Sequence, residues 1–499
     1  MASIRATDSS VINDILVIGF SRDKKSKKFT IETGGLNFDA KPVIAALDDL
    51  GATAATDEVI KLPGSSTKLI VLTGLGQSAN TFPHEVLRRA AGAAARALAG
   101  HESATFALPA LDESSFSAVA EGALLGAYAF DEFRGNSKAE RKPALKKINL
   151  FIKGADQKRY AKLLKRAQII AEYTHVVRDL INTPPSHLTP DSFCQRFKKM
   201  AAGSSVKVEI LNDTQLRKLG YGGIIGVGQG SANKPRLLHL SYTPKGNKKN
   251  LKRYAFVGKG ITFDTGGLAL KPAQGMEAMK SDMSGAAAVS AAILAIAKLE
   301  LPVAIDAWAP LAENMVSDTA TRPSDIITIY GGKTVEVLNP DAEGRLVLAD
   351  AIMKATEVGK KAGGLDGLVD VATLTGAQVV ALGTRTSAVM TNNIQFSEEF
   401  LKIASQTGEQ FWPMPLPEEL RASLDSPVAD IANIGDRMGG MLVAGLFLKE
   451  FVEADLPWLH LDIAGPAYND GKAHGYTPVG GTGVALRTLV ALAESAAPR

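Results

Sequence analysis

Two carboxylates and a guanidinium stand at alternate positions in Asn339–Leu346, whose sequence is NPDAEGRL. If the backbone is extended there, the two-residue period of a strand puts Asp341, Glu343 and Arg345 on one side. Adjacent acids repel each other, so a cation has to lie between them, and a divalent metal ion is the usual choice. Arg345 is then left to bind an anion or a substrate oxygen. The competing interpretation is a polar loop with a solvated salt bridge.

A second group of charged residues follows a short buried-strand pattern at Tyr254–Val257. Lys259 and Asp264 lie in the glycine-rich stretch after it, so we expect them beyond the carboxyl end of a strand, where α/β sheets place their ligand sites. Asp282 comes shortly before an expected helix over Ser284–Leu299. Taken alone, Asp282 equally suits an acid at a helix N-terminus, and Lys259 suits a surface lysine.

The acids of the two stretches together indicate a metal centre. Two divalent cations would balance the charge of four carboxylates, and a buried site needs that balance because uncompensated charge there is very costly. If Lys259 is a further ligand, it has to be a neutral amine, and a neighbouring divalent ion would lower its pKa accordingly. None of the seven histidines shows metal-ligand spacing such as H-E-x-x-H. The four acids are Asp264, Asp282, Asp341 and Glu343.

The length and composition favour a globular protein of two domains. A chain of 499 residues is too long for one hydrophobic core, and 45% hydrophobic and 22% charged residues are ordinary proportions. The net charge is +4, and the basic excess lies in residues 1–180. The charge runs Arg22–Lys28 and Lys138–Lys147 hold no interleaved aromatic residues for base stacking, so solvated loop tips are the better interpretation. Binding of nucleic acid stays open but is not favoured.

The single cysteine, Cys194, allows no disulfide within the chain, which suits a reducing cytoplasm. It lies inside an expected helix, where a small apolar filler is the better interpretation than a nucleophile. No charged segment followed by an apolar run marks a secretory signal, and no uncharged apolar run reaches membrane-spanning length, ~18 residues. We therefore expect a cytoplasmic protein that does not enter membranes.

Strand and helix patterns alternate along the first part of the chain, so residues 1–155 are expected to form a small α/β domain. Apolar residues then recur every three or four positions over 156–182, which predicts one helix of ~26 residues, about 39 Å long. Pro184 and Pro185 end that helix because proline lacks the N–H donor. The remaining residues, 183–499, carry all the candidate site residues and form the expected catalytic domain.

The glycine-rich stretch Tyr221–Ser231 matches a dinucleotide-binding fingerprint only in part. Its sixth position is Ser231 rather than glycine, and no helical pattern follows it. Leu237–Tyr242 has the pattern of a strand instead. A nucleotide site is therefore not expected here.

Several stretches of the second half resemble the leucyl aminopeptidase family, also called cytosol aminopeptidases, and in particular its bacterial aminopeptidase A type. They are VGKGITFDTGG at Val257–Gly267, KP at Lys271–Pro272, MKSDM at Met279–Met283, DAEGRL at Asp341–Leu346, ATLTGA at Ala372–Ala377 and HLDIAG at His460–Gly465. The likeness covers the whole second half and, more loosely, the layout of the first. It implies a small N-terminal α/β domain of macro-like fold, a long linker helix and a larger C-terminal α/β/α catalytic domain with a mixed central sheet.

The resemblance implies a two-metal exopeptidase that removes N-terminal residues, preferentially Leu and other apolar ones, from peptides. Manganese or zinc is expected, although oxygen ligands with one amine also suit Co²⁺ and Mg²⁺. One metal would be held by Lys259, Asp264, Asp282 and Glu343, and the other by Asp264, Glu343 and Asp341 with its main-chain carbonyl.

The resemblance also implies roles for further residues. Lys271 would polarise the scissile carbonyl and stabilise the developing oxyanion, and Arg345 would hold a bicarbonate ion that acts as general base. The family assembles as a homohexamer whose active sites face an interior cavity. Four residues would line the apolar pocket for the first side chain of the substrate: Met279, Thr373, Gly376 and Ala464.

One position departs from the family pattern. The family usually has Asn-Thr before the first acid of this motif, whereas this chain has Asn339 and Pro340 before Asp341. Proline fixes φ and removes a hydrogen-bond donor beside an expected metal ligand. Both carboxylates and the arginine are retained, so we expect activity to remain while the metal affinity or preference can differ.

Two other functions stay open at this point. A DNA-binding role rests on analogy with some bacterial relatives alone, and its mark would be a continuous basic groove. Another two-metal hydrolysis, such as that of phosphate esters, would need the same kind of acids.

Overall fold

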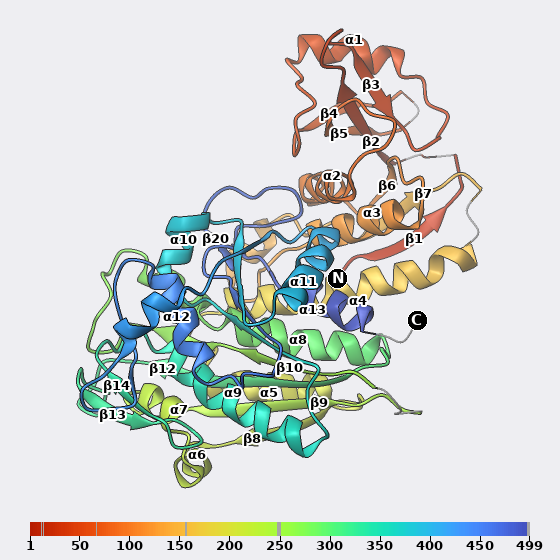
Figure 1. Ribbon diagram of the computed structural model, residues 1–499. Helices are drawn as coiled ribbons and strands as arrows, with labels where there is room; N and C mark the ends of the chain where they lie inside the picture. Colours follow the sequence, from red (N-terminus) through yellow and green to blue (C-terminus); the bar gives the residue numbers. More distant parts are fainter. Residues whose placement is uncertain (11, 13, 66, 155–156, 247–250, 497–499) are drawn as a thin grey trace. The chain divides into compact units, whose positions relative to one another are not determined.

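The computed structural model describes residues 1–499 with the exception of 11, 13, 66, 155–156, 247–250 and 497–499 (Figure 1). The chain forms two compact units. Unit 1 consists of Met1–His175 and Asp470–Val479, and unit 2 consists of Val176–Asn469 and Gly480–Arg499. Both units have α/β architecture, which confirms the predicted fold class. None of the described helices is long and apolar enough to cross a membrane.

The boundary between the units falls inside the long helix α4, Gln157–Asn182. Its 26 residues confirm the predicted long helix. A late segment, Asp470–Val479, belongs to unit 1, which no sequence pattern indicated. The division into domains 1–155 and 183–499 with a linker between them stays a prediction, and residues 155–156 lie outside the described residues.

Unit 1 is built on a mixed sheet with the strand order β1-β7-β6-β2-β5-β4, and β3 pairs with β2. Strands β1, β7, β6, β2 and β5 run parallel, whereas β3 and β4 are antiparallel to their neighbours. The strands are β1 (Ser3–Thr7), β2 (Ile15–Arg22), β3 (Phe29–Glu32), β4 (Val59–Pro63), β5 (Leu69–Gln77), β6 (Ser103–Ala107) and β7 (Lys147–Phe151). The helices are α1 (Lys41–Asp49), α2 (His84–Ala97), α3 (Glu113–Gly126) and the 3-10 helix η1 (Asn136–Glu140).

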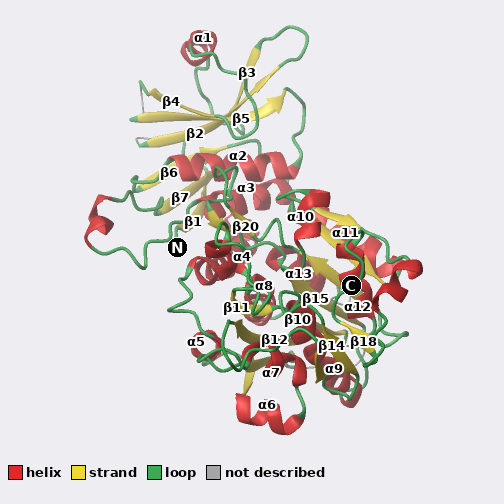
Figure 2. Ribbon diagram, turned by 90° about the vertical axis from the view of Figure 1, so that its left-hand side faces the viewer, coloured by secondary structure: helices red, strands yellow, loops and turns green. Residues whose placement is uncertain are grey.

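Helices α2 and α3 lie side by side against this sheet (Figure 2). Their backbones come close together because glycines stand at the crossing. A Cβ atom at Gly122 would lie 2.0 Å from the carbonyl oxygen of Arg88, and one at Gly126 would lie 2.2 Å from that of Gly92. Buried apolar side chains such as Phe106 fill the space between the helices and the strands.

Unit 2 is organised around a larger mixed sheet with the order β17-β16-β19-β15-β10-β12-β9-β8, and β11 pairs with β12. The central strands β19, β15, β10 and β12 run parallel, whereas β8, β9 and β16 have antiparallel neighbours. The strands are β8 (Lys207–Leu211), β9 (Arg236–Tyr242), β10 (Arg253–Gly258), β11 (Gly260–Asp264), β12 (Ala304–Asn314), β15 (Gly367–Ala372), β16 (Ser387–Thr391), β17 (Phe411–Pro413) and β19 (Trp458–Asp462). Smaller sheets contain β13 (Asp325–Thr328), β14 (Thr334–Val337) and β18 (Ile431–Ala432), and β20 (Tyr468–Asn469) and β21 (Gly480–Gly481).

Helices cover both faces of the large sheet. Figure 1 shows α8 on one side of β10 and α9 on the other, and α13 packs on α8. The apolar face of α9 enters the main hydrophobic core, where Val347 and Ile352 are fully buried. The helices are α5 (Pro190–Ala201), α6 (Asp213–Leu219), α7 (Gly222–Gly228), α8 (Ser284–Lys298), α9 (Gly344–Lys361), α10 (Gly376–Leu382), α11 (Ile394–Thr407), α12 (Gly440–Lys449) and α13 (Leu486–Ser495), with the 3-10 helices η2 (Met276–Ser281) and η3 (Glu418–Leu424).

Two predicted elements of unit 2 are confirmed: the helix after Asp282 is α8, and the strand at Leu237–Tyr242 is β9. The glycine-rich stretch before β9 contains helix α7. A Cβ atom at Gly223 would lie 2.2 Å from the carbonyl oxygen of Leu346, so α7 packs with its backbone against α9. The contact gives these glycines a packing role.

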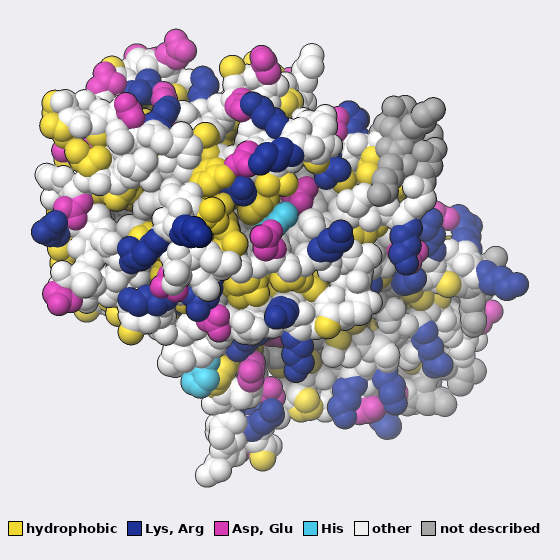
Figure 3. All heavy atoms as spheres, turned by 90° about the horizontal axis from the view of Figure 1, so that it is seen from below, with side chains coloured by type: hydrophobic (Ala, Val, Ile, Leu, Met, Phe, Trp, Pro, Cys, Tyr) yellow, Lys and Arg dark blue, Asp and Glu magenta, His cyan; other side chains and the backbone are white. Residues whose placement is uncertain are grey.

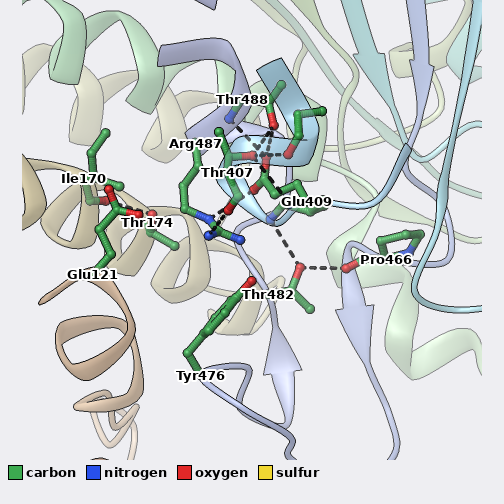
Figure 4. Close-up of polar contacts among 12 residues, drawn as sticks. Glu121, Ile170, Thr174, Thr407, Glu409, Pro466, Tyr476, Thr482, Arg487 and Thr488 are labelled. Carbon is green, nitrogen blue, oxygen red and sulfur yellow. Dashed lines mark hydrogen bonds and ion pairs between the residues drawn. The ribbon is translucent and has the colours of Figure 1, made fainter. Parts of the chain in front are cut away.

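Buried polar contacts join the end of α11 to α13 (Figure 4). The Oε2 atom of Glu409 accepts hydrogen bonds from the main-chain nitrogen (3.0 Å) and the hydroxyl (2.5 Å) of Thr488. Arg487 donates from Nη1 to the carbonyl oxygen of Thr407 at 2.5 Å. These contacts satisfy a buried carboxylate and hold α13 next to α11.

Replacing Gly122 with alanine is expected to destabilise the protein by about 1–3 kcal/mol, because the added methyl group forces α2 and α3 apart. Urea unfolding measures the change. Gly135→Ala is the matched control, since a Cβ at Gly135 would meet no atom within 4 Å. Equal unfolding midpoints for the two variants would show that the helix crossing tolerates the extra volume.

Candidate active site

The predicted site residues lie at the carboxyl-terminal edge of the parallel strands in unit 2. Lys259 directly follows β10, Thr373 directly follows β15, and Asp264 is the last residue of β11. Because these strands run in the same direction, their ends bring distant parts of the chain to one edge. The stretch from Lys259 to Asp264 lies beyond the end of β10, as the sequence predicts, and it also contains β11, which pairs with β12. The register of a strand therefore positions Asp264.

The ammonium group of Lys259 lies between two carboxylates. Its Nζ atom is 2.8 Å from Asp282 Oδ1 and 2.8 Å from Glu343 Oε1. It also donates a hydrogen bond to the carbonyl oxygen of Thr373 at 2.8 Å. This approach requires glycine at the start of α9, because a Cβ atom at Gly344 would lie 2.5 Å from Lys259 Cε.

A second lysine bridges the other two acids. Lys271 Nζ lies 2.8 Å from Asp264 Oδ2 and 2.5 Å from Asp341 Oδ1. The Lys271 side chain is 21% exposed, whereas that of Lys259 is 4% exposed. Lys271 is therefore the more accessible of the two ammonium groups to a ligand from solution.

Carboxylate oxygens gather at one point of the site. One oxygen each of Asp264, Asp341 and Glu343 lie within 4.8 Å of one another. Thr373 donates from Oγ1 to Asp282 Oδ1 at 2.8 Å, while Asp282 Oδ2 is buried and has no hydrogen-bond partner among the described residues. Asp282 is not one of these three, but the charges of Glu343 and Asp264 act on it, and its unsatisfied buried oxygen fits the oxygen ligand sets of divalent cations.

Burial dominates the electrostatics of these groups. It raises the pKa of Asp282, Glu343 and Asp341 above the usual range of carboxyl groups. Burial also acts to lower the pKa of Lys259, but the charges of three neighbouring carboxylates outweigh it and raise that pKa. The acids therefore need adjacent cations to stay ionised. A neutral Lys259 amine stays a prediction for the metal-bound protein.

The stretch Asn339–Leu346 is not extended, so the prediction from a two-residue period is wrong. The chain turns at Asp341, Glu343 has helical angles (φ −81°, ψ −33°), and α9 begins at Gly344. The apolar face of α9 is buried in the core, and this packing outweighs the alternating pattern of charges. Asp341 and Glu343 still reach one site, whereas Arg345 lies in the first turn of the helix.

Arg345 is buried in a separate polar environment. Its Nη1 atom donates to the carbonyl oxygen of Asn433 at 2.7 Å, and its guanidinium lies 5.8 Å from the ring centroid of Phe447. The Nε atom is buried without a hydrogen-bond partner among the described residues. Burial lowers the pKa of Arg345 to about 10. A buried guanidinium with an unused donor fits an anion.

The four predicted pocket residues occupy three segments. Met279 lies half-buried in η2, Gly376 is exposed at the start of α10, and Ala464 lies half-buried after β19. A Cβ atom at Gly376 would meet no atom within 4 Å, so this position borders open space. Thr373 is buried, and its hydrogen bond to Asp282 links the segment that follows β15 to the acids.

Two buried asparagines hold the acid-bearing segments, and the sequence analysis missed both. Asn314, the last residue of β12, donates from Nδ2 to Asp264 Oδ1 (2.9 Å) and to the carbonyl oxygen of Pro340 (3.1 Å). Asn433 donates from Nδ2 to the carbonyl oxygen of Asn339 at 2.7 Å. Neither amide carries a charge, although the strand-end position of Asn314 is a signal that could have indicated it.

The turn that contains Pro340 is closed without a donor at that residue. The main-chain nitrogen of Asp341 donates to Asn339 Oδ1 at 2.9 Å. Pro340 contributes its carbonyl oxygen, which accepts from Asn314. The fixed φ of proline is therefore accommodated, and its effect on metal affinity stays a prediction.

Family models match both parts of the chain. The model of the cytosol aminopeptidase family, catalytic domain, matches residues 175–490, and the N-terminal domain model of the same family matches residues 24–137. A probable cytosol aminopeptidase of Streptomyces avermitilis is 50% identical over 506 residues, with 98% of this chain and 97% of the relative covered. One of Streptomyces coelicolor is 52% identical over 472 residues, with 91% and 90% covered.

Solved structures of two other enzymes resemble this chain over nearly its whole length. The bottromycin maturation enzyme BotP in complex with Mn has a TM-score of 0.84 at 35% sequence identity, over 97% of this chain and 99% of that one. A mutant of tomato leucine aminopeptidase has a TM-score of 0.85 at 31% identity, over 99% and 97%. The likeness therefore includes the segments that carry the acids.

Asn314→Ala is expected to weaken divalent-metal affinity about 10–100-fold, because Asp264 loses the donor that orients it. The measurement is the manganese concentration that gives half-maximal hydrolysis of a leucine anilide. Asn233→Ala is the matched control, since its amide donates to Glu313 Oε2 (3.0 Å), on the residue next to Asn314. Equal manganese requirements for both variants would show that Asn314 does not support the metal site.

Proposed function

The chain belongs to the cytosol aminopeptidase family, and from this premise we propose which bond it cleaves and how its residues take part. The protein is a metal-dependent aminopeptidase that acts on peptides. We propose that it preferentially removes Leu and other apolar residues from the N-terminus. The main support for metal-dependent hydrolysis at this site is the gathering of four acids and two lysines from distant segments at one strand edge.

The site uses divalent metal, and we propose two ions per subunit, Mn or Zn. When bound, such ions supply a water of lowered pKa and positive charge for the oxyanion of the tetrahedral intermediate. The carboxylate cluster and the unsatisfied Asp282 Oδ2 support this proposal, as does the Mn complex of BotP. The proposed ligands are Lys259, Asp264, Asp282 and Glu343 for one ion, and Asp264, Asp341 and Glu343 for the other.

We propose that Lys271 donates a hydrogen bond to the oxygen of the scissile carbonyl. Its ammonium lies against Asp264 and Asp341, and it is exposed enough for a peptide to reach it. A positive charge held at that place stabilises the negative charge that develops on the oxygen. Lys271 would thus act on the transition state more than on the bound substrate.

We propose that Arg345 binds bicarbonate, which accepts a proton from the attacking water as general base. The unused Nε donor of the buried guanidinium supports this assignment. Its contact with the main chain at Asn433 fixes the direction of the guanidinium plane. Among the described residues, no carboxylate lies within ion-pair distance of the Arg345 guanidinium. A bound bicarbonate would supply the missing negative charge.

The pocket for the first side chain is proposed to be formed by Met279, Thr373, Gly376 and Ala464. The open space beside Gly376 supports this, because a substrate side chain needs room there. The link from Thr373 to Asp282 would place the pocket next to the acids. An apolar cleft of this kind would favour apolar first residues over charged ones, because burying an unpaired charge is costly.

We also propose a cytoplasmic homohexamer. The names of the relatives support the compartment, and the family resemblance supports the assembly, which light scattering tests. Figure 3 shows one face of the molecule, on which Lys and Arg are interspersed with Asp and Glu. Mixed charge on that face supports solvated residues rather than a nucleic-acid groove, and a gel shift at physiological salt tests this.

Glu343→Gln is expected to lower kcat for leucine anilide hydrolysis at least ~100-fold, above the range for residues that only support a ligand. The substitution keeps the shape of the side chain and removes its charge, so the fold and assembly should persist. Glu357→Gln on the same helix is the control, because Glu357 pairs with surface lysines. Near-normal turnover in a metal-depleted preparation would end the two-metal account.

Arg345→Ala is expected to reduce kcat about 100-fold, the lower end of general-base contributions, with partial rescue by added bicarbonate. A bicarbonate titration of wild type and variant in degassed buffer measures this. Arg345→Lys separates charge from the planar donor set. The assignment fails if Arg345→Ala matches wild type at every bicarbonate concentration.

A further inference from the structure

The carboxylate of Asp462 lies fully buried at the end of β19, between β15 and β16. Its Oδ1 atom accepts hydrogen bonds from the main-chain nitrogens of Leu374 (3.1 Å) and Ala464 (3.2 Å). Its Oδ2 atom accepts from Thr375 Oγ1 at 2.8 Å. Donors from two loops thus converge on one charged group that is neither a proposed metal ligand nor a proposed pocket residue.

The same two loops and the first residue of α10 carry three of the proposed pocket residues: Thr373, Ala464 and Gly376. Thr375 caps helix α10, because its Oγ1 accepts from the main-chain nitrogen of Gln378 at 3.0 Å. Because the hydroxyl of Thr375 donates its proton in a hydrogen bond to Asp462, a lone pair of the same oxygen stays directed at the first turn of α10. Asp462 therefore orients the hydroxyl group that caps the helix beside the proposed pocket.

The segment from Thr373 to the first turn of α10 forms one wall of the proposed pocket, and further contacts hold both of its ends. Gln378 Oε1 accepts from the main-chain nitrogen of Gly465 at 2.7 Å, which joins α10 to the loop after β19. At the other end, Thr373 binds Asp282 through its hydroxyl and Lys259 through its carbonyl oxygen. One end of the wall is thus fixed to the acids of the site, and the other end is fixed by buried polar contacts.

The carboxylate of Asp462 lies near other buried charged groups, which act on its pKa. Burial raises the pKa of Asp462, and the neighbouring His460 opposes that shift. His460 in turn forms an ion pair with Asp370, with Nδ1 and Oδ1 2.5 Å apart. An amide at position 462 would therefore keep the shape of the side chain and change both its charge and its acceptance of the Thr375 proton.

We propose that Asp462 is a positioning residue that sets the selectivity of the pocket for the first side chain, acting through the hydroxyl of Thr375. The proposal rests on the aminopeptidase function proposed above. With the hydroxyl held, α10 starts at Gly376 and its first turn forms a fixed wall. Without it, the first turn of α10 loses its cap and frays, so a large first side chain loses more binding than a small one.

The test compares Thr375→Val, which removes the hydroxyl and keeps the shape, with Thr375→Ser, which keeps the hydroxyl. The full-length, manganese-loaded enzyme is assayed for kcat and KM with leucine and alanine p-nitroanilides. Thr375→Val is expected to lower the Leu-to-Ala ratio of kcat/KM about tenfold, chiefly through KM for the leucine substrate. Thr375→Ser should retain the wild-type ratio.

Thr189→Val is the matched control. Thr189 caps α5 through a hydroxyl that accepts from Ser192, and α5 carries none of the proposed site residues. Its loss should leave the Leu-to-Ala ratio unchanged. Asp462→Asn is the second variant, and its ratio should fall in the same direction as that of Thr375→Val. It decides the question if Thr375→Val does not yield folded enzyme.

An unchanged ratio in a folded, manganese-loaded Thr375→Val enzyme overturns the inference. An equal loss for both substrates together with lost manganese also overturns it, because Thr375 would then support the metal site alone. A wild-type enzyme without preference for leucine would instead overturn the proposed function. The two failures are therefore distinguishable.

Discussion

Carboxylates that are buried together repel one another, and unit 2 holds its acids at one strand edge by interleaving lysines between them. Lys259 lies between Asp282 and Glu343, and Lys271 lies between Asp264 and Asp341, with every ion pair at 2.8 Å or less. Removing one partner of a fully buried pair costs about 3–5 kcal/mol, so Lys259 cannot be displaced unless another cation takes over its role. This balance constrains the backbone around the site, because the charged groups have to approach one another closely.

The backbone permits that approach through small residues where helices meet the strands. A Cβ atom at Gly285, in the first turn of α8, would lie 2.0 Å from the carbonyl oxygen of Val371 and 2.9 Å from the nitrogen of Lys259. Gly344 does the same for the side chain of Lys259 at the start of α9. Two helices on opposite faces of the sheet therefore begin against one lysine, and their first turns fix its position. The charges of Lys259, Asp264 and Glu343 are thus attached to the ends of core elements.

The charged part of this site could be predicted from sequence, and the supporting part could not. Acids and lysines at strand ends carry a signal in residue type and spacing, and Lys259, Asp282 and Glu343 do lie together. The alternating spacing at residues 341–345 predicted an extended backbone, which is wrong. The burial of the apolar face of α9 determines the backbone conformation there, and the period of the charges does not. Asn314 holds Asp264 through its neutral side-chain amide, and asparagine is common at turns in general, so the residue type alone indicates nothing. Its role depends on a contact with residues far away in the chain, which a single sequence does not show.

Selectivity and chemistry share one segment of chain in this architecture. The residues after β15 contact Asp282 and Lys259 through Thr373 and then continue into the wall that begins at Gly376. A change of pocket shape at Thr373 must therefore disturb the acids, since its hydroxyl and carbonyl are both engaged there. A change at the far end, where Asp462 holds Thr375 before the start of α10, acts on the wall at a residue that only Leu374 separates from Thr373. Variation in substrate preference is thus physically easiest at the α10 end of the segment, where Thr375 binds Asp462 rather than one of the four acids.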